Sequence, residues 1–323
     1  MSVQQAPPSV RAKAKTEAAR RASLVAWVSL LIVWVVWGST YLSIRVGDET
    51  IPPLVLAAVR YLVAGLIMFP FAYRNAASAA RAAGARRYWP RRSQWLGCAV
   101  VGILLLGANG AVCVGETTVP SGLAALLVAT VPLWLLSMDA VLNHARPGLA
   151  PMAGLVIGLA GVGLLSGLGG GKAGVSASGV VIILVAAAAW ALGTIMARRV
   201  RTPASPALTS AMQLLIGGAV LLVLAAVTGE FGSFRLSAVS DRSWLALGYL
   251  ILAGSIVAFS AYVIAVRMLP TATVATYAYV NPVIAVLLGT LILNEPLTLG
   301  MLAGGVLIVG AVVLVVRRSP PAH

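Results

Sequence analysis

Acidic residues, histidines and cysteines are scarce in this sequence of 323 residues, which holds eight Asp and Glu, two His and two Cys. His144 and His323 are too few for a histidine-based metal site, because such sites combine several ligands. Cys98 and Cys113 fall in one apolar run, and their spacing on a helix separates them by roughly 22 Å, beyond the reach of a disulfide. The sequence therefore predicts no metal or other cofactor, and no disulfide.

Charge of either sign is also sparse. Charged residues make up 10% of the chain and hydrophobic residues 60%, and the mean hydropathy is +0.98, which indicates a membrane protein. The net charge of +15 would suggest nucleic-acid binding in a soluble protein. Here the charge lies in the connections between apolar runs, so no basic face remains for a nucleic acid. The expected partners are the lipid bilayer and a small-molecule substrate, with no nucleic acid.

The sequence is built twice. The apolar run from Pro270 to Pro296 aligns without a gap with the run from Pro120 to Arg146 at an offset of 150 residues, so Pro282 matches Pro132. A proline removes a backbone donor and disfavours helix at the preceding residue, so Asn281 is predicted to lie at a weak point of its span. A second offset, of 153 residues, relates the front of each half and matches Trp37 with Trp190, Arg45 with Arg198, Pro53 with Pro206, Leu62 with Leu215 and Gly65 with Gly218.

Ten apolar runs are predicted to cross the bilayer. The first, from Leu24 to Ile44, is longer than the apolar core of a signal peptide, so we interpret it as a retained span. Five spans in each half is an odd number, so the second half enters the membrane from the opposite side, as in alternating-access transporters with inverted repeats. The predicted spans are 24–44, 54–72, 94–114, 119–141, 150–167, 177–197, 206–227, 244–266, 271–293 and 298–316.

Lys and Arg are divided unequally between the two sides of this arrangement. With a cytoplasmic N terminus, eighteen fall in cytoplasmic segments, four on the opposite side and one, Arg60, inside a span. This bias predicts that both termini are cytoplasmic. The predicted organisation is a basic cytoplasmic tail, disordered or interfacial, over 1–23, a first five-helix repeat over 24–167, an inverted second repeat over 177–316, and a cytoplasmic tail over 317–323.

An ordered set of short motifs carries a family resemblance. The first span contains WVVWGSTYLSIR (34–45), the second contains LAAVRYLVAG (56–65), and the ninth ends in ILNEPLT (292–298). With the two sets of five spans, these motifs resemble the EamA-type branch of the drug/metabolite transporter superfamily from Trp27 to Val316. The resemblance implies an exporter of small metabolites, a group that includes amino-acid and aromatic amino-acid exporters. It also implies a central cavity lined by the first, third, fourth, sixth, eighth and ninth spans.

The family's glutamate after the ninth span is present as Glu295, which we expect to cap the tenth helix, where a negative group near the N terminus is favourable. Its frequent counterpart after the fourth span is absent, since Ala145 occupies that position. None of the eight acidic residues is predicted near the bilayer midplane, and Glu116 and Asp139, which come nearest, fall close to span ends. Proton-driven exporters often use a buried carboxylate as a relay. We therefore expect facilitative or exchange transport, or protons that couple through something other than a midplane carboxylate.

Arg60 is a cation at membrane depth, where insertion costs about 2.5–3.5 kcal/mol, so it is expected to face protein or water. It either neutralises a substrate carboxylate, or it snorkels or pairs with helix-end carbonyls. Aromatic rings inside the spans either wall a cavity, through stacking and cation–π contacts, or pack between helices. Asn109 and Asn281 either contact substrate or bond between helices. We predict a substrate site, without catalytic or metal-binding residues, formed by Trp37, Tyr41, Arg60, Asn109, Trp190, Tyr262, Tyr279 and Asn281.

The sequence thus favours an inner-membrane transporter that exports small metabolites, with amino acids preferred and aromatic amino acids compatible with the walls. A multidrug exporter of lipophilic cations is the alternative, although that class would use an intramembrane carboxylate. A passive channel shares the two-fold inverted design. An enzyme is not expected, because no nucleophile with a base lies inside the spans. The oligomeric state is left open between monomer and homodimer.

Overall fold

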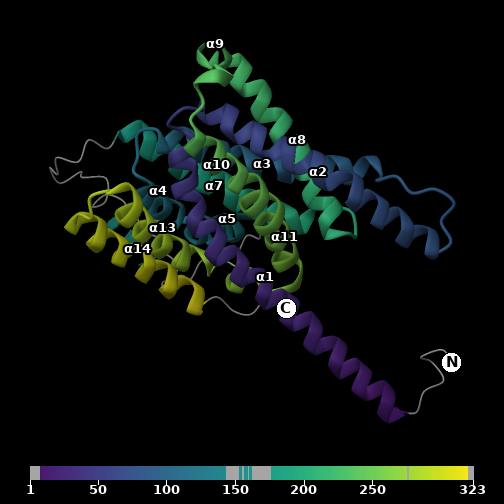
Figure 1. Cartoon of the computed structure of the whole chain (residues 1–323). Coiled ribbons are helices and arrows are strands. Elements are labelled where there is room, and N and C mark those ends of the chain that lie inside the picture. Colours follow the sequence, from purple (N-terminus) through teal and green to yellow (C-terminus); the bar gives the residue numbers. More distant parts are fainter. Residues whose placement is uncertain are drawn as a thin grey trace.

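The computed structural model describes residues 8–142, 176–274 and 276–318, together with 153–154, 156–158 and 160–161. Throughout these residues the secondary structure is helical, and no strand occurs (Figure 1). The main helices are α1 (Pro8–Gly47), α2 (Pro53–Ala82), α3 (Arg92–Glu116), α4 (Ser121–Val128), α5 (Val131–Leu142), α7 (Ala177–Arg199), α8 (Pro206–Val227), α10 (Asp241–Tyr249), α11 (Phe259–Met268), α13 (Tyr277–Leu293) and α14 (Leu299–Arg318). Shorter pieces are α9 (Glu230–Ser233), η2 (Leu236–Ala238), η3 (Leu250–Ala258) and α12 (Thr271–Val274).

Within the described residues, seven helical stretches are long and apolar enough to cross a membrane. They correspond to the first four predicted spans and to the sixth, seventh and eighth. The ninth and tenth are represented by the shorter apolar helices Val280–Leu293 and Leu299–Ala311, and the predicted fifth span, 150–167, lies mostly outside the described residues. The seven stretches are Arg20–Gly47, Pro53–Ala82, Arg92–Glu116, Ser121–Leu142, Ala177–Arg199, Pro206–Val227 and Asp241–Met268.

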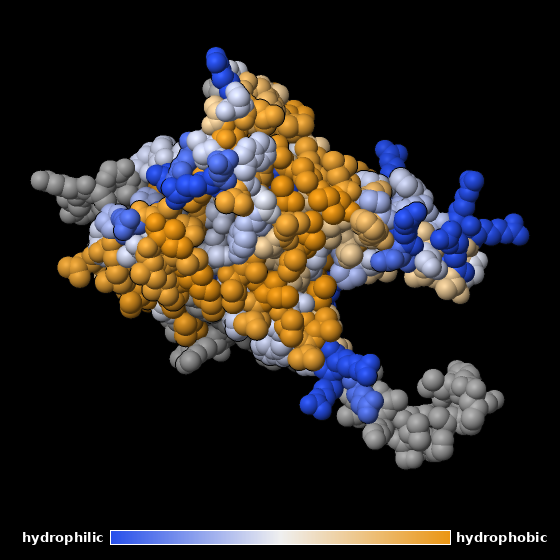
Figure 2. All heavy atoms as spheres, in the orientation of Figure 1, coloured by the Kyte–Doolittle hydropathy of each residue, from blue (hydrophilic) through white to orange (hydrophobic). Residues whose placement is uncertain are grey.

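The surface of the bundle is apolar where it would meet lipid. Figure 2 shows hydrophobic side chains over the body of the molecule and hydrophilic ones gathered at its extremities, including the projecting part of α1. Large apolar side chains such as Phe71, Val185 and Leu291 are exposed to 65%, 62% and 76%. Such a belt is unfavourable in water and favourable against hydrocarbon. The chain is therefore a multi-pass, all-helical membrane protein.

Three local features differ from the sequence-based expectation. The basic tail, predicted to be disordered or interfacial, is helical from Pro8 and continuous with the first span, because Ala, Lys, Arg and Glu are strong helix formers. For the same reason α2 continues ten residues past its predicted end at residue 72, to Ala82. The predicted span 244–266 is helical, but its middle is the π-helix η3, a conformation that often occurs at functional sites.

The repeat-related helices α2 and α8 pack against each other through reciprocal contacts. Gly65 on α2 faces Leu215 on α8. Its repeat partner Gly218 on α8 faces Leu62 on α2, which is the repeat partner of Leu215. A methyl group built on Gly65 would lie 2.9 Å from the backbone nitrogen of Leu215, and one on Gly218 would lie 2.8 Å from that of Leu62. Only glycine allows the two backbones to approach this closely.

Replacing Gly218 with alanine should therefore destabilise the protein by about 1–3 kcal/mol, because the neighbouring backbone must move to relieve the overlap. Thermal unfolding of the purified protein would measure the change. The matched control is Gly107→Ala in α3, where an added methyl group meets nothing within 4 Å and helix propensity favours alanine. Equal melting temperatures for Gly218→Ala and the original protein would contradict the packing argument.

Candidate functional site

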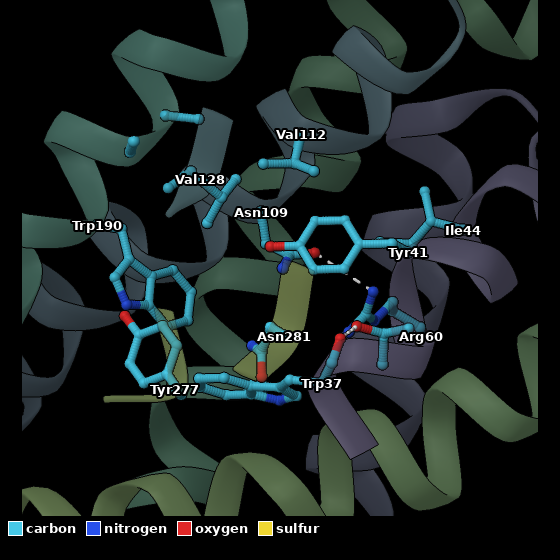
Figure 3. A pocket seen from close by; sticks show the side chains of 14 residues that line it. Trp37, Tyr41, Ile44, Arg60, Asn109, Val112, Val128, Trp190, Tyr277 and Asn281 are labelled. Atoms are coloured by element: carbon cyan, nitrogen blue, oxygen red, sulfur yellow. Dashed lines mark hydrogen bonds between the residues drawn. The ribbon is translucent and has the colours of Figure 1, made fainter. Parts of the chain in front are cut away.

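A cavity lies between α1, α2, α3, α4, α7 and α13, and side chains from the two halves of the sequence meet there (Figure 3). The cavity volume, counted as the space available to the centre of a water molecule, is about 50 Å³. Since one water needs about 10–15 Å³ by this measure, a molecule the size of an amino acid enters only if the lining moves. Its lining consists of Trp37, Thr40, Tyr41, Ile44, Arg60, Ala108, Asn109, Val112, Val128, Ala186, Ala187, Trp190, Tyr277 and Asn281.

Three aromatic rings line one wall of the cavity, and a fourth ring packs behind them. The rings of the repeat-related Trp37 and Trp190 meet edge to face, with centroids 5.3 Å apart, and Tyr277 approaches Trp37 in the same manner at 5.7 Å. Tyr262 packs behind them, 4.9 Å from Trp37 and 5.6 Å from Trp190. Edge-to-face pairs are the favoured geometry for aromatic rings. The wall is therefore held by its own packing and presents ring faces and edges to the cavity.

The π-helix η3 fixes this wall from behind. The Trp37 indole nitrogen donates to the Gly254 carbonyl of η3 at 3.3 Å. In α11, which follows η3, the Tyr262 hydroxyl forms a hydrogen bond of 2.7 Å with the Thr194 hydroxyl of α7. The Ser255 hydroxyl donates to the Leu250 carbonyl, five residues earlier, at 2.9 Å. The wider π-turn thus turns Gly254 and Ser255 toward α1 and α2, where each bonds to a cavity residue.

Arg60 is 2% exposed, which excludes the interpretation that it snorkels to the surface. Its Nε donates to the Ser255 hydroxyl at 3.2 Å and its Nη1 to the Asn109 Oδ1 at 3.3 Å, while the guanidinium also lies 4.5 Å from the centre of the Tyr61 ring. These partners are neutral, and no carboxylate in the described part of the chain accepts a hydrogen bond from Arg60. A guanidinium stays charged in proteins. The cavity therefore contains a buried positive charge without a directly bound anion.

Asn281 precedes Pro282 in α13, which continues as a helix through the proline, and it is 4% exposed. With its amide oriented to satisfy its neighbours, the side-chain nitrogen donates to the Trp34 carbonyl at 2.9 Å and to the Tyr277 carbonyl at 3.2 Å. This orientation follows from the hydrogen-bond network. The bond to Trp34 connects α13 to α1 next to Pro282. The amide oxygen takes part in neither bond.

Six of the eight predicted site residues line the cavity: Trp37, Tyr41, Arg60, Asn109, Trp190 and Asn281. Tyr262 does not line it but supports its wall, and the side chain of Tyr279 lies outside the described part. The prediction missed Tyr277, although it lies in the same apolar run as Asn281, and it missed Thr40 and the small or aliphatic lining residues. No pattern in the sequence separates a cavity-lining Ala or Val from one in contact with lipid.

Glu295 does not cap the tenth helix as predicted. Its carboxylate accepts from the backbone nitrogens of Ser121 at 2.9 Å and Gly122 at 3.2 Å, and from the Ser121 hydroxyl at 2.9 Å. It therefore caps α4, the helix of the other half, whose first residues follow Pro120 and have no side-chain cap of their own. An N-terminus attracts whichever carboxylate the tertiary structure brings to it.

Asp48 follows α1 and lies close to one end of the cavity, since its backbone nitrogen bonds to the carbonyl of the lining residue Ile44. Burial raises the pKa of Asp48 well above its usual range, and the nearby charges of Arg45 and Arg60 only partly oppose this rise. The folded protein therefore retains a proton that the unfolded chain releases above about pH 4. Stability should fall as the pH rises from about 4 to the pKa of the folded state.

Asp48→Asn should flatten this decline by about 1.4 kcal/mol for each unit by which the pKa is raised. Melting temperatures of the purified protein between pH 4 and pH 9 would measure it. Glu49→Gln, a change at an exposed neighbouring acid, serves as the control and should keep the original slope. A decline that is equally steep in Asp48→Asn would show that the proton is bound elsewhere.

Comparisons with known proteins agree with this architecture. The model of the EamA-like transporter family matches the chain twice, over residues 24–167 and 177–317. The Escherichia coli protein named uncharacterized inner membrane transporter YedA is 39% identical over 291 residues, which cover 89% of each chain. A Salmonella typhimurium protein named probable amino-acid metabolite efflux pump is 26% identical over 294 residues, 86% of this chain and 90% of that one. A solved crystal structure with 21% identity superposes with a TM-score of 0.58 over 91% of this chain and 96% of its own, and shows the fold alone.

The two family matches coincide with the two halves that the sequence repeat defines, and together they cover more than half of the chain. The described helices, the apolar belt and the cavity between the halves suit a transporter. From these observations we conclude that the chain belongs to the EamA-like transporter family.

Proposed function

We propose that this protein is an inner-membrane secondary transporter that exports small metabolites, foremost amino acids, by alternating access through the central cavity. The observation that carries the proposal is Arg60, a buried guanidinium whose bonded partners, Ser255 and Asn109, are both neutral. A carboxylate is the geometric and electrostatic complement of a guanidinium. An amino acid brings that group into the cavity, whereas in the empty site the guanidinium has no directly bound anion.

The aromatic wall supports aromatic amino acids as good substrates. Trp37, Trp190 and Tyr277 line the same cavity as the polar side chains of Arg60 and Asn109, so a ring can stack on the aromatic wall while Arg60 holds the carboxylate. The relative named a probable amino-acid metabolite efflux pump supports this substrate class. The outward direction rests on that relative and on the family resemblance.

The alternative, export of lipophilic cations, is disfavoured by the charge of the cavity. No acidic side chain is among its lining residues in the described part of the chain, and Arg60 would repel a cation. A passive channel would show neither saturation nor counterflow, and the experiment below separates it from a carrier.

The proposed architecture is ten spans in two inverted five-helix repeats, residues 24–167 and 177–316. Reciprocal contacts support it: Arg45 donates to the Glu116 and Thr117 carbonyls at the end of α3, and its repeat partner Arg198 donates to the Val266 and Leu269 carbonyls at the end of α11. These contacts lie at opposite ends of the bundle if the halves are inverted. The packing of α2 on α8 supports the same pseudo-symmetry.

The tails 1–23 and 317–323 are proposed to be cytoplasmic, on the basis of the unequal division of Lys and Arg. Arg86→Cys in the connection between α2 and α3 tests the orientation. A membrane-impermeant maleimide should label this cysteine in inside-out vesicles and leave it unlabelled in right-side-out vesicles. The opposite result would reverse the topology.

The function is tested by counterflow in proteoliposomes. Vesicles loaded with millimolar unlabelled tryptophan, alanine or another amino acid would receive a trace of the labelled form outside, with no ion gradient. We expect transient accumulation of label that depends on the internal amino acid. Its absence for every amino acid, in vesicles shown to hold folded protein, would refute amino-acid transport by this cavity.

A further inference from the structure

Two carboxylates lie buried beyond one end of the cavity without hydrogen-bond donors. Glu116, the last residue of α3, is 0% exposed, and both of its carboxylate oxygens are buried and unpartnered among the described residues. Both carboxylate oxygens of Asp48 are likewise buried and have no hydrogen-bond partner among the described residues. Buried polar groups are nearly always hydrogen-bonded, and a buried ionised carboxylate is costly unless it is paired. Two such groups together therefore call for a ligand.

The carboxylates are one helical turn from the cavity. Glu116 lies four residues beyond the lining residue Val112 on α3, and the Asp48 backbone nitrogen bonds to the carbonyl of Ile44, another lining residue, at 2.8 Å. The charge of Asp48 acts on Glu116, and the charge of Glu116 acts on Tyr41 in the cavity wall. The pair is thus placed to influence a molecule bound in the cavity.

The charged groups that face the pair do not neutralise it. Arg45 is the nearest cation by sequence, but its guanidinium donates to the backbone carbonyls of Glu116 and Thr117 and not to a carboxylate. Glu230 and Glu295 add negative charge, and both already cap helix N-termini, those of α2 and α4. The charged and titratable groups in electrostatic range of the pair are Tyr41 and Arg45 on α1, Arg60 on α2, Cys113 on α3, Glu230 on α9 and Glu295 after α13.

A proton suits this site better than a metal ion. Two arginines within electrostatic range oppose a second cation, and no group of three or more metal-ligating side chains occurs in the described part of the chain. Burial also raises the pKa of Asp48 well above its usual range. A bound proton neutralises one of the two carboxylates and weakens the repulsion between them, which removes part of the cost of burial.

We propose that Asp48 and Glu116 form a buried proton-binding site whose occupancy controls how strongly Arg60 binds the carboxylate of the substrate. The coupling rests on the proposed function, because it assumes a substrate carboxylate at Arg60. Both acids lie in electrostatic range of Arg60. When they are ionised, they compete with a substrate carboxylate for its positive charge, and when a proton neutralises them, Arg60 is available to the substrate.

By linkage the effect is reciprocal, so binding of a carboxylate at Arg60 takes up a proton at the acid pair. The site belongs to one half only. The sequence repeat places Arg201 opposite Asp48 and Val266 opposite Glu116. The repeat positions of the other half therefore carry no carboxylate, so the two ends of the transporter differ in proton binding at these positions.

The proton site is tested without substrate by infrared spectroscopy of the full-length protein in lipid nanodiscs. A carbonyl band of a protonated carboxyl group should be present at neutral pH and should disappear as the pH is raised toward 10. Glu116→Gln and Asp48→Asn keep the shape of each side chain and should each remove this band or shift its midpoint. Glu49→Gln, at the exposed neighbour, should leave it unchanged. Absence of a band between pH 5 and pH 10, or a band unaffected by both variants, overturns the site.

The coupling is tested by calorimetry with L-tryptophan in two buffers of different ionisation enthalpy. We expect the original protein to take up as much as one proton per tryptophan bound, and its affinity to fall at most about tenfold per pH unit above the midpoint of the band. The double variant Asp48→Asn/Glu116→Gln should bind tryptophan without proton uptake. Binding without uptake in the original protein overturns the coupling. If tryptophan fails to bind while the band behaves as described, the proton site stands and the proposed substrate is wrong.

Discussion

Replacing Arg60 with glutamine should raise the concentration of tryptophan that gives half-maximal counterflow by about 30-fold or more. Truncating one partner of a buried, hydrogen-bonded charge pair costs about 2–5 kcal/mol, and each 1.4 kcal/mol is tenfold in affinity. Glutamine retains polar atoms for Ser255 and Asn109 but removes the charge. The effect is measured as the concentration of tryptophan that gives half-maximal counterflow in proteoliposomes.

A purely structural role for Arg60 would also reduce activity, so the substrate is changed as well. Tryptophan amide has the same ring and ammonium group but lacks the carboxylate. The wild-type protein should prefer tryptophan over its amide by the same factor by which Arg60→Gln raises the half-maximal concentration of tryptophan. Arg60→Gln itself should show almost no preference. Arg60→Lys should fall between them, because lysine keeps the charge but not the planar pair of donors. An undiminished preference in Arg60→Gln would place the carboxylate elsewhere.

Replacing Trp37 with alanine should reduce the preference for tryptophan over alanine as substrate by about tenfold. Trp37 contacts Trp190, Tyr262 and Tyr277 and lines the cavity. Its removal eliminates an aromatic contact worth about 0.5–1.5 kcal/mol beyond the apolar area it buries, and it loosens the remaining wall. Competition between labelled tryptophan and unlabelled alanine in counterflow would measure the change in selectivity.

The matched control for this substitution lies on the same helix. Trp27 is 51% exposed and does not line the cavity, so Trp27→Ala should leave the selectivity unchanged. The thermal stability of both variants should be recorded, because the loss of Trp37 from a packed wall also costs about 3–5 kcal/mol of folding free energy. A fall in transport of tryptophan and alanine by the same factor would indicate damage to the fold and not to a selective wall.

The candidate site was predictable where its residues are unusual for a membrane. A cation, an asparagine beside a proline and a repeated tryptophan are each improbable in a lipid-facing position, so Arg60, Asn281 and the pair Trp37 and Trp190 could be selected from sequence. Tyr277 could not be separated from its neighbours in the same run, since both tyrosines near Pro282 satisfy the same pattern. The choice between them depends on helix rotation, which packing determines.

Partners across the repeat were likewise beyond prediction. Glu295 was expected to cap the helix that follows it, but its carboxylate bonds to Ser121 and Gly122, which are more than 170 positions away. Glu116 was placed correctly near a span end, yet nothing in its sequence neighbourhood indicates that the side chain is fully buried without a donor. Local sequence sets what a side chain can do, and its burial depends on elements that are distant in sequence.

The sequence by itself determined that the protein is helical, crosses a membrane many times, repeats its design and resembles one family, because apolar runs, their lengths and their repeated residues are properties of the chain alone. Only the tertiary structure decided that Arg60 faces Asn109 and a π-helix at Ser255, and that Asp48 and Glu116 lie buried together at one end of the cavity. Hydrophobicity selects which segments enter the bilayer, whereas close packing at positions such as Gly65 and Gly218 decides which faces of those segments meet.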